Sequence, residues 1–290
     1  MIISVIFMGV WGALIEVPEK NGFPATLGYV VWALTMIPAA IIALYINKWK
    51  LEYDKRSLIS GCLIGFLGAA GQLVLFFVLK TAPAYLVFPL LSLTPVVTIL
   101  LAVIFLKERT GRVGWIGIGA AVIAILLLSY QSPGDNEISG YSWMLLTAMV
   151  LVAWGAQGFI MRFANETMKA ESIFFYMMVT SILLIPVALW MTDFSKEINW
   201  GFKGPYLAGM VQILNAFGAL YLVYAFRYGK AIIVAPMTTA LSPVLTVIIS
   251  LAIYAVIPHP IIISGILLAI ISAFLMGVEE TKLEKAVEEV

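Results

Sequence analysis

The chain has 290 residues, of which 62% are hydrophobic and 11% charged, and its mean hydropathy is +1.04. Soluble domains contain about half apolar and about a quarter charged residues, so this composition excludes an ordinary soluble protein and indicates an integral membrane protein. The net charge of +1 gives no indication of nucleic-acid binding. Since Cys62 and His259 are the single cysteine and histidine, we expect no disulfide within the chain, no metal site and no cofactor.

Apolar runs bounded by charged residues, Gly or Pro follow one another along the whole chain. Each run has roughly the length of a membrane-spanning helix, about 20 residues. In hydrocarbon only a helix or a closed barrel satisfies its own backbone hydrogen bonds, and runs this uniformly apolar exclude barrel strands. We therefore predict an all-α membrane protein with ten transmembrane helices, at about 2–17, 26–46, 58–79, 83–106, 113–130, 141–161, 173–191, 206–226, 231–257 and 261–278.

The first run, 2–17, contains Glu16, the one charged residue that falls inside these runs. A carboxylate in lipid costs several kcal/mol unless it faces water or a partner or takes up a proton. A group that takes up a proton there would suit proton coupling. The alternative is an interfacial role, because Glu16 lies about 20 Å along the helix from Ile2 and is followed at once by Val17, Pro18 and Glu19.

Short segments recur between the two halves of the chain. "LTPVVT" at 93–98 matches "LSPVLT" at 241–246, and the same offset aligns "GIGAAVI" at 117–123 with "GILLAII" at 265–271. "WGA" at 11–13 recurs at 154–156. Because each half holds five helices, an odd number, the second half must enter the membrane from the opposite side. We predict two inverted-topology five-helix repeats, residues 1–130 and 141–278, followed by an acidic cytoplasmic tail, residues 279–290.

Polar side chains form a stripe on the ninth predicted helix and its repeat partner, the fourth. Hydroxyl residues share one face in both, and we assign this stripe to the substrate pathway: Thr94, Thr98, Thr238, Thr239, Ser242 and Thr246. Pro95 and Pro243 break these helices and each leave a carbonyl without its helical donor, at Leu91 and Thr239. Such carbonyls could bind a polar substrate group. The alternative is that the hydroxyls satisfy these carbonyls or bridge helices.

Trp11, Trp154 and Gln157 are further candidates for the substrate pathway, because the two tryptophans occupy matching positions in the two halves and Gln157 lies beside Trp154 on one helix face. The alternative for each is helix packing. No lysine or arginine falls mid-helix, which argues against a site for phosphorylated or strongly anionic solutes. No glycine loop for ATP and no paired carboxylates or nucleophile–base set occur in the runs, so we expect neither ATP drive nor an enzyme.

The basic residues indicate the orientation in the membrane. If the N-terminus is cytoplasmic, then of the 17 Lys and Arg residues only Lys20, Lys80, Lys196 and Lys203 lie on the opposite side. The positive-inside rule therefore predicts that both termini are cytoplasmic.

The order of these features resembles the drug/metabolite transporter (DMT) superfamily, specifically its EamA-type members. The matching features are the early Trp-Gly of each half, the Ser/Thr-Pro of each fourth helix, and the Lys-Glu-Arg at 107–109 that closes the first of these helices. The second half departs from the pattern, with Ala255, Val256 and Ile257 in place of that triplet. The family carries amino acids, sugars, nucleotide-sugars, drugs and other metabolites, so the resemblance implies a transporter without fixing the substrate.

We therefore expect a secondary transporter that moves a small metabolite across the plasma (inner) membrane of a bacterium or archaeon by alternating access. Amino acids or related neutral and amphiphilic compounds are the first substrate class, and the resemblance implies export. Coupling is either to protons through Glu16 or absent, as in facilitated exchange. The expected partners are the substrate and membrane lipid, and a homodimer is compatible with the sequence. The alternative is a channel or a non-transporting membrane scaffold.

Overall fold

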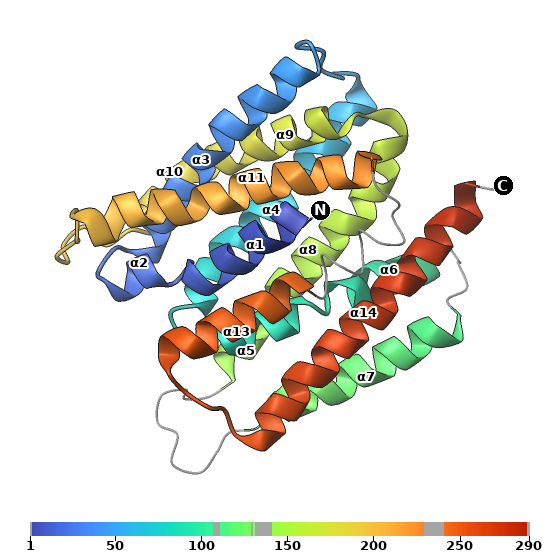
Figure 1. Cartoon of the computed structure of the whole chain (residues 1–290). Coiled ribbons are helices and arrows are strands. Elements are labelled where there is room, and N and C mark those ends of the chain that lie inside the picture. Colours follow the sequence, from blue (N-terminus) through green and yellow to red (C-terminus); the bar gives the residue numbers. More distant parts are fainter. Residues whose placement is uncertain (1, 107–110, 129, 131–140, 229–240, 289–290) are drawn as a thin grey trace.

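A computed structural model describes residues 2–106, 111–128, 130, 141–228 and 241–288. The described part of the chain contains helices and no strand (Figure 1). The elements are α1 (Ile2–Leu14), α2 (Val17–Lys20), α3 (Ala25–Ile46), α4 (Lys55–Val78), α5 (Ala84–Leu91), α6 (Thr94–Leu106), α7 (Arg112–Leu128), α8 (Ser142–Thr167), α9 (Ala170–Leu183), α10 (Ile185–Trp190), the π-helical turn η1 (Phe202–Tyr206), α11 (Leu207–Tyr228), α13 (Ser242–Tyr254) and α14 (Pro260–Glu288).

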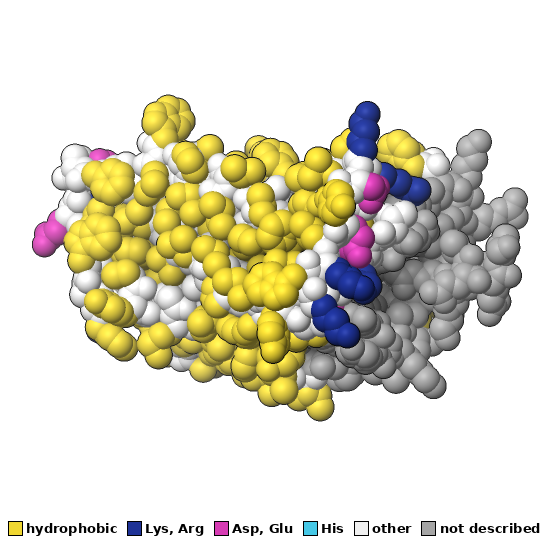
Figure 2. Space-filling model, turned by 90° about the horizontal axis from the view of Figure 1, so that it is seen from above, with side chains coloured by type: hydrophobic (Ala, Val, Ile, Leu, Met, Phe, Trp, Pro, Cys, Tyr) yellow, Lys and Arg dark blue, Asp and Glu magenta, His cyan; other side chains and the backbone are white. Residues whose placement is uncertain are grey.

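The lengths and composition of these helices fit a multi-pass membrane protein. Six segments of the described chain are long and apolar enough to cross a membrane: Ile2–Lys20, Ala25–Ile46, Lys55–Val78, Ala84–Phe105, Ser142–Met161 and Ala170–Trp190. Three shorter apolar helices accompany them: Arg112–Leu128, Ser242–Tyr254 and Pro260–Met276. On the face shown in Figure 2, hydrophobic side chains cover the broad middle, and charged side chains gather towards the two ends. Such an apolar belt is the surface that a lipid bilayer covers.

Several predicted helices are broken or end at other residues than expected. The first ends at Leu14, and a turn at Ile15 and Glu16 leads into the short α2. The run 83–106 forms two helices, α5 and α6, because the ring of Pro95 removes the amide hydrogen that a continuous helix would need. Pro186 begins α10 in the same way. The predicted end of the ninth helix at Ile257 is wrong, since Ala255 has a φ of 52° and terminates α13 at Tyr254.

The tail 279–290, predicted as a separate acidic segment, continues α14 as far as Glu288 in the described backbone. No side chain of this stretch is described.

Helix contacts cross between the two halves of the chain. Helix α1 packs on α11 and α13, whereas α8, in the second half, packs on α4 and α6. Helix α3 packs on α9 and α11, α4 on α9, and α7 on α14, whose two ribbons lie side by side in Figure 1. Three of these contacts thus have a counterpart in which the halves exchange roles: α1–α11 matches α8–α4, α1–α13 matches α8–α6, and α3–α11 matches α9–α4.

Polar contacts between helix ends show the directions in which the helices run. At one end of the molecule, Tyr254 at the end of α13 contacts both Glu16, just after α1, and Tyr85, in the first turn of α5. We call this the Glu16 end. At the other end, the Lys169 ammonium, just after α8, donates to the Asn47 side chain, just after α3, over 3.0 Å. Since α3 starts near the Glu16 end and finishes at Asn47, α8 and α1 run in opposite directions.

Glycines on α4 let two helices of the second half approach closely. A Cβ at Gly61 or Gly65 would collide with side chains of α9, and one at Gly71 would lie 2.5 Å from the indole nitrogen of Trp154 on α8. Gly68 faces Gln157 of the same helix. Close backbone approach of this kind is the usual way in which membrane helices gain packing energy without a hydrophobic driving force.

Candidate functional site

Two matching hydrogen bonds join the halves at threonines of the predicted stripe. The Thr98 hydroxyl on α6 donates to the Gly155 carbonyl on α8 over 3.1 Å, and the Thr246 hydroxyl on α13 donates to the Gly9 carbonyl on α1 over 3.0 Å. Both threonines are buried. The packing of α6 against α8 is called the α6–α8 seam below, and that of α13 against α1 the α1–α13 seam.

The glycines of the repeated Trp-Gly-Ala segments make room for these two seams. A Cβ on Gly12 would lie 2.5 Å from the Thr246 hydroxyl oxygen and 2.9 Å from a ring carbon of Phe88. A Cβ on Gly155 would collide with the Val97 side chain. Both positions therefore require glycine, because any side chain would push the two helices apart.

The remaining described hydroxyls of the stripe also bond to backbone carbonyls. The Ser242 hydroxyl lies 3.4 Å from the Val5 carbonyl oxygen. The Thr94 hydroxyl donates to the Leu91 carbonyl over 2.5 Å, so the carbonyl that Pro95 leaves without a helical donor is already bonded. Pro243 is buried near the start of α13. The side chain of Pro95 is not described, and Thr238, Thr239 and the 107–109 triplet lie outside the described residues.

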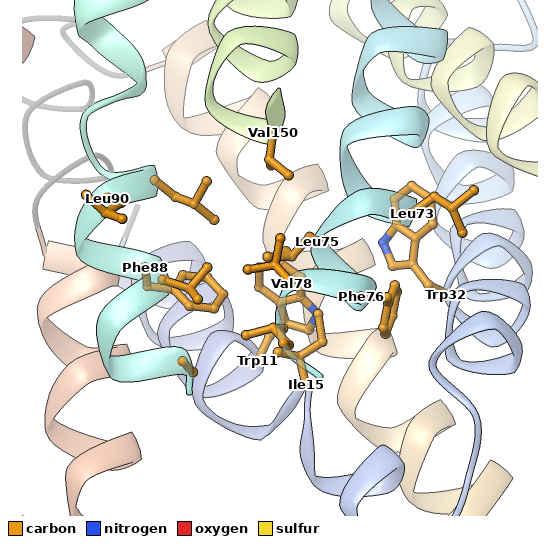
Figure 3. Close-up of a cluster of buried hydrophobic side chains, with 14 of the residues drawn as sticks. Trp11, Ile15, Trp32, Leu73, Leu75, Phe76, Val78, Phe88, Leu90 and Val150 are labelled. Carbon is orange, nitrogen blue, oxygen red and sulfur yellow. The ribbon is translucent and has the colours of Figure 1, made fainter. Parts of the chain in front are cut away.

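Both candidate tryptophans donate to a helix of the opposite half. The Trp11 indole N–H donates to the Gln212 side-chain oxygen on α11 over 2.9 Å, and that of Trp154 donates to the Gly68 carbonyl on α4 over 3.3 Å. Trp11 is buried and its ring meets the edge of Phe88 at a centroid distance of 5.8 Å, as seen in Figure 3. Gln157 is half-buried beside Gly68. These residues therefore lie where the halves meet.

Glu16 is buried, with 3% of its surface exposed, in the turn between α1 and α2. One carboxylate oxygen accepts a hydrogen bond from the Tyr254 hydroxyl over 2.7 Å, and the other lies 3.8 Å from the Lys20 ammonium. Lys20 also donates to the Tyr254 hydroxyl. A second ion pair, between Glu19 and Lys80 at 3.9 Å, lies one turn away. The carboxylate is thus buried against charged and polar partners from both halves of the chain.

The structure adds residues that the sequence analysis did not select. Trp32 on α3 donates its indole N–H to the Asn215 side-chain oxygen over 2.8 Å, beside the bond from Trp11 to Gln212. Gln212 and Asn215 stand one turn apart on α11 and are both buried. Their spacing on one face was visible in the sequence, but the two tryptophans that bond them come from helices far away in the chain.

Comparison with known proteins identifies the family. Residues 1–130 and 139–278 match the EamA-like transporter family. The chain belongs to this family. It is therefore a multi-pass membrane protein of a transporter family, as the resemblance implied, and such a transporter acts on a small-molecule substrate.

Relatives of this EamA-like protein cover very different shares of it. The uncharacterized transporter YyaM of Bacillus subtilis is 26% identical over 267 residues, 84% of this chain and 86% of that protein. An uncharacterized Methanocaldococcus jannaschii protein, MJ1333.1, is 34% identical over 104 residues, 35% of this chain and 76% of its own length. A probable magnesium transporter of Candida albicans is 36% identical over 70 residues, 24% of this chain and 19% of that protein.

A solved structure, titled only as the crystal structure of a protein, has the same fold. It superposes with a TM-score of 0.63 at 17% identity and covers 95% of each chain. The helical arrangement of this EamA-like transporter therefore occurs in an experimentally determined structure.

Proposed function

We propose that this protein is a secondary transporter that moves a small neutral or amphiphilic metabolite, with amino acids as the first class, by alternating access between two inverted five-helix repeats. The observation that carries the proposal is the exchange of contacts between halves, above all the matching α1–α13 and α6–α8 seams. In transporters built from inverted repeats, rocking of one repeat against the other opens a central site to each side in turn.

The directions of the helices support the inverted arrangement. Tyr254 at the end of α13 meets Tyr85 at the start of α5, so the segments that carry the repeated "LTPVVT" and "LSPVLT" motifs run in opposite directions. Helices α1 and α8, which carry the repeated "WGA", also run oppositely. A twofold axis in the membrane plane would relate such segments, and ten crossings in two sets of five would produce them.

The hydrogen bonds in the two seams are weak enough to be exchanged when one repeat moves against the other. A hydrogen bond between helices in a membrane contributes about 0.6 kcal/mol on average, so a hydroxyl such as that of Thr98 or Thr246 can leave one carbonyl for another at small cost. Each end of the molecule is also held by polar contacts between the halves, Glu16 with Tyr254 at one end and Asn47 with Lys169 at the other. Alternating access requires that these two sets of contacts break in turn.

The substrate class follows from the polar groups between the halves. Between the Glu16 end and the Asn47–Lys169 contact, the described polar groups that join the halves include hydroxyls, amides and indole N–H groups, which suit a solute without strong net charge. A strongly anionic solute would need fixed cations. Export is the direction that the family resemblance implies.

Coupling to protons is assigned to Glu16. Its carboxylate is buried and joins α1 to α13 through Tyr254, so a change in its protonation would change a contact between the halves. Burial of a carboxylate at a helix junction in a membrane protein costs several kcal/mol and is a feature of proton relays.

The proposal is tested by solute counterflow. Purified protein is placed in liposomes preloaded with an unlabelled metabolite, chosen by a thermal-shift screen that includes neutral amino acids and Mg²⁺, the latter because of the short match to a probable magnesium transporter. Saturable uptake of the labelled solute against its gradient supports the transporter. Flux that rises linearly with concentration would indicate a channel, and the absence of flux a scaffold.

A further inference from the structure

Two buried amide side chains stand one turn apart on α11, Gln212 and Asn215. Each is held by a tryptophan from another helix, Trp11 of α1 at 2.9 Å and Trp32 of α3 at 2.8 Å. The arrangement therefore brings three helices together around a pair of amides.

The tryptophans determine which way the amides point. An indole N–H can only donate, so the amide atom that faces it must be the oxygen. The NH₂ groups of Gln212 and Asn215 consequently point away from the indoles. Among the described residues, the Gln212 nitrogen has no hydrogen-bond partner, and the Asn215 nitrogen has the Met8 sulfur at 3.7 Å, a weak acceptor.

A buried donor without a partner is costly, about 1–3 kcal/mol for a neutral polar group, so such groups call for a functional explanation. Gln212 is 1% exposed and is one of the residues around a cavity of about 10 Å³, roughly the volume that one water molecule needs. The other walls are two aromatic rings, one carboxylate, three small residues and two larger apolar residues: Phe23, Phe76, Glu19, Ala25, Gly28, Ala208, Ile15 and Pro18.

We propose that the amide nitrogen of Gln212 forms a subsite that binds a carbonyl or carboxylate oxygen of the transported solute, with the rings of Phe23 and Phe76 against its apolar part. The subsite rests on the proposed transport function and names the chemistry of its substrate, a small solute that presents an acceptor oxygen beside an apolar group. Solute entry requires the cavity to widen.

The test uses three matched probes on the purified full-length protein: leucine, leucinamide and 3-methylbutylamine. Leucinamide and the amine carry the same charge and the same branched carbon chain, but only leucinamide presents a carbonyl oxygen. Dissociation constants come from titration of intrinsic tryptophan fluorescence. We expect the protein to bind leucine and leucinamide about tenfold more tightly than the amine, the ratio that one good hydrogen bond provides.

Three variants isolate the subsite. Gln212→Met keeps the length of the side chain and removes the amide, so the preference for leucinamide over the amine should fall to about one. Trp11→Phe leaves the amide but removes the donor that orients it, and the preference should fall only in part. Thr192→Val is the matched control, because it removes a buried hydrogen bond to Thr26 on a different helix pair and should keep the preference.

The inference is overturned if Gln212→Met retains the preference, if the unmodified protein binds the amine as tightly as leucinamide, or if it binds none of the three probes. Counterflow of another solute by the unmodified protein would in each case leave the transport function standing. Loss of counterflow for every solute, with the probe preference intact, would contradict transport while supporting the binding site.

Discussion

The α1–α13 and α6–α8 seams are built alike and differ in what surrounds them. Each has a threonine hydroxyl on a carbonyl of the facing helix and a glycine that allows close approach. The indole of Trp11, however, donates to an amide side chain, whereas that of Trp154 donates to a backbone carbonyl. The α1–α13 seam also ends at the buried Glu16. The difference teaches that the two seams share one packing pattern, while the polar partners around each seam are specific to one half.

The largest expected effect comes from Glu16→Gln. If this carboxylate couples transport to protons, the variant should lose uptake driven by an imposed pH gradient and keep solute exchange, because exchange needs no net proton movement. Uptake into liposomes with and without the gradient measures both. Asp193→Asn is the control, since Asp193 is exposed and pairs with Lys196 instead. Driven uptake that survives in Glu16→Gln would make Glu16 a structural residue.

Glycine replacements test whether both seams need close approach. Gly12→Ala and Gly155→Ala should each lower the free energy of unfolding by about 1–3 kcal/mol, since an added methyl group in a packed interface forces the helices apart. The thermal-unfolding midpoint of purified protein measures the effect. Gly119→Ala in α7 is the control, because a Cβ there meets nothing within 4 Å. If only one of the two variants kept an unchanged midpoint, the two seams would differ in their need for close helix approach.

Tyr254→Phe tests the end at which the seams differ. The variant removes the hydroxyl that donates to Glu16 and leaves the edge-to-face contact of the ring with Tyr85. We expect a loss of about 1 kcal/mol in stability, the value of a typical hydrogen bond, together with a changed pH dependence of driven uptake. If the variant loses stability but keeps its pH profile, the Tyr254 hydroxyl stabilises the Glu16 end without taking part in proton coupling.

The smallest effects are expected for Thr98→Val and Thr246→Val. Each removes one hydrogen bond between helices while keeping the side-chain volume, and should cost about 0.6 kcal/mol, the average found for such bonds in membranes. The two losses should be equal within error in thermal-unfolding measurements, because the contacts match. A much larger loss for Thr246→Val would show that the two contacts are not equivalent, and altered counterflow in that variant alone would support a role of the hydroxyl in the substrate pathway.

Much of the molecule could be predicted from hydropathy. The apolar runs became helices because hydrocarbon leaves the backbone no other hydrogen-bond partners, and the family was recognisable from its spaced motifs. The residues at which helices end were harder to predict. Pro258 shows that the helix must stop nearby, but the stop at Tyr254 depends on the left-handed conformation of Ala255, for which alanine has no intrinsic preference.

The candidate site was predicted in part. Trp11 and Trp154 were selected because they repeat, and they do lie between the halves, but their role in substrate binding stays a prediction. Gln212 was left out because an amide on an apolar helix, even with Asn215 on the same face, looks the same whether it packs or binds. Its hydrogen bond to Trp11, which lies 201 residues away along the chain, distinguishes it.

By itself the sequence determined that the chain crosses a membrane several times, that its halves share motifs and that it belongs among transporters, because transfer to hydrocarbon depends on residue type and each span satisfies its own backbone. The tertiary structure decided which polar groups meet: the stripe hydroxyls on carbonyls, Glu16 on Tyr254 and the amides of α11 on two indoles. Such pairings are set by the distances between helices, which depend on packing across the whole molecule and are encoded in no single segment.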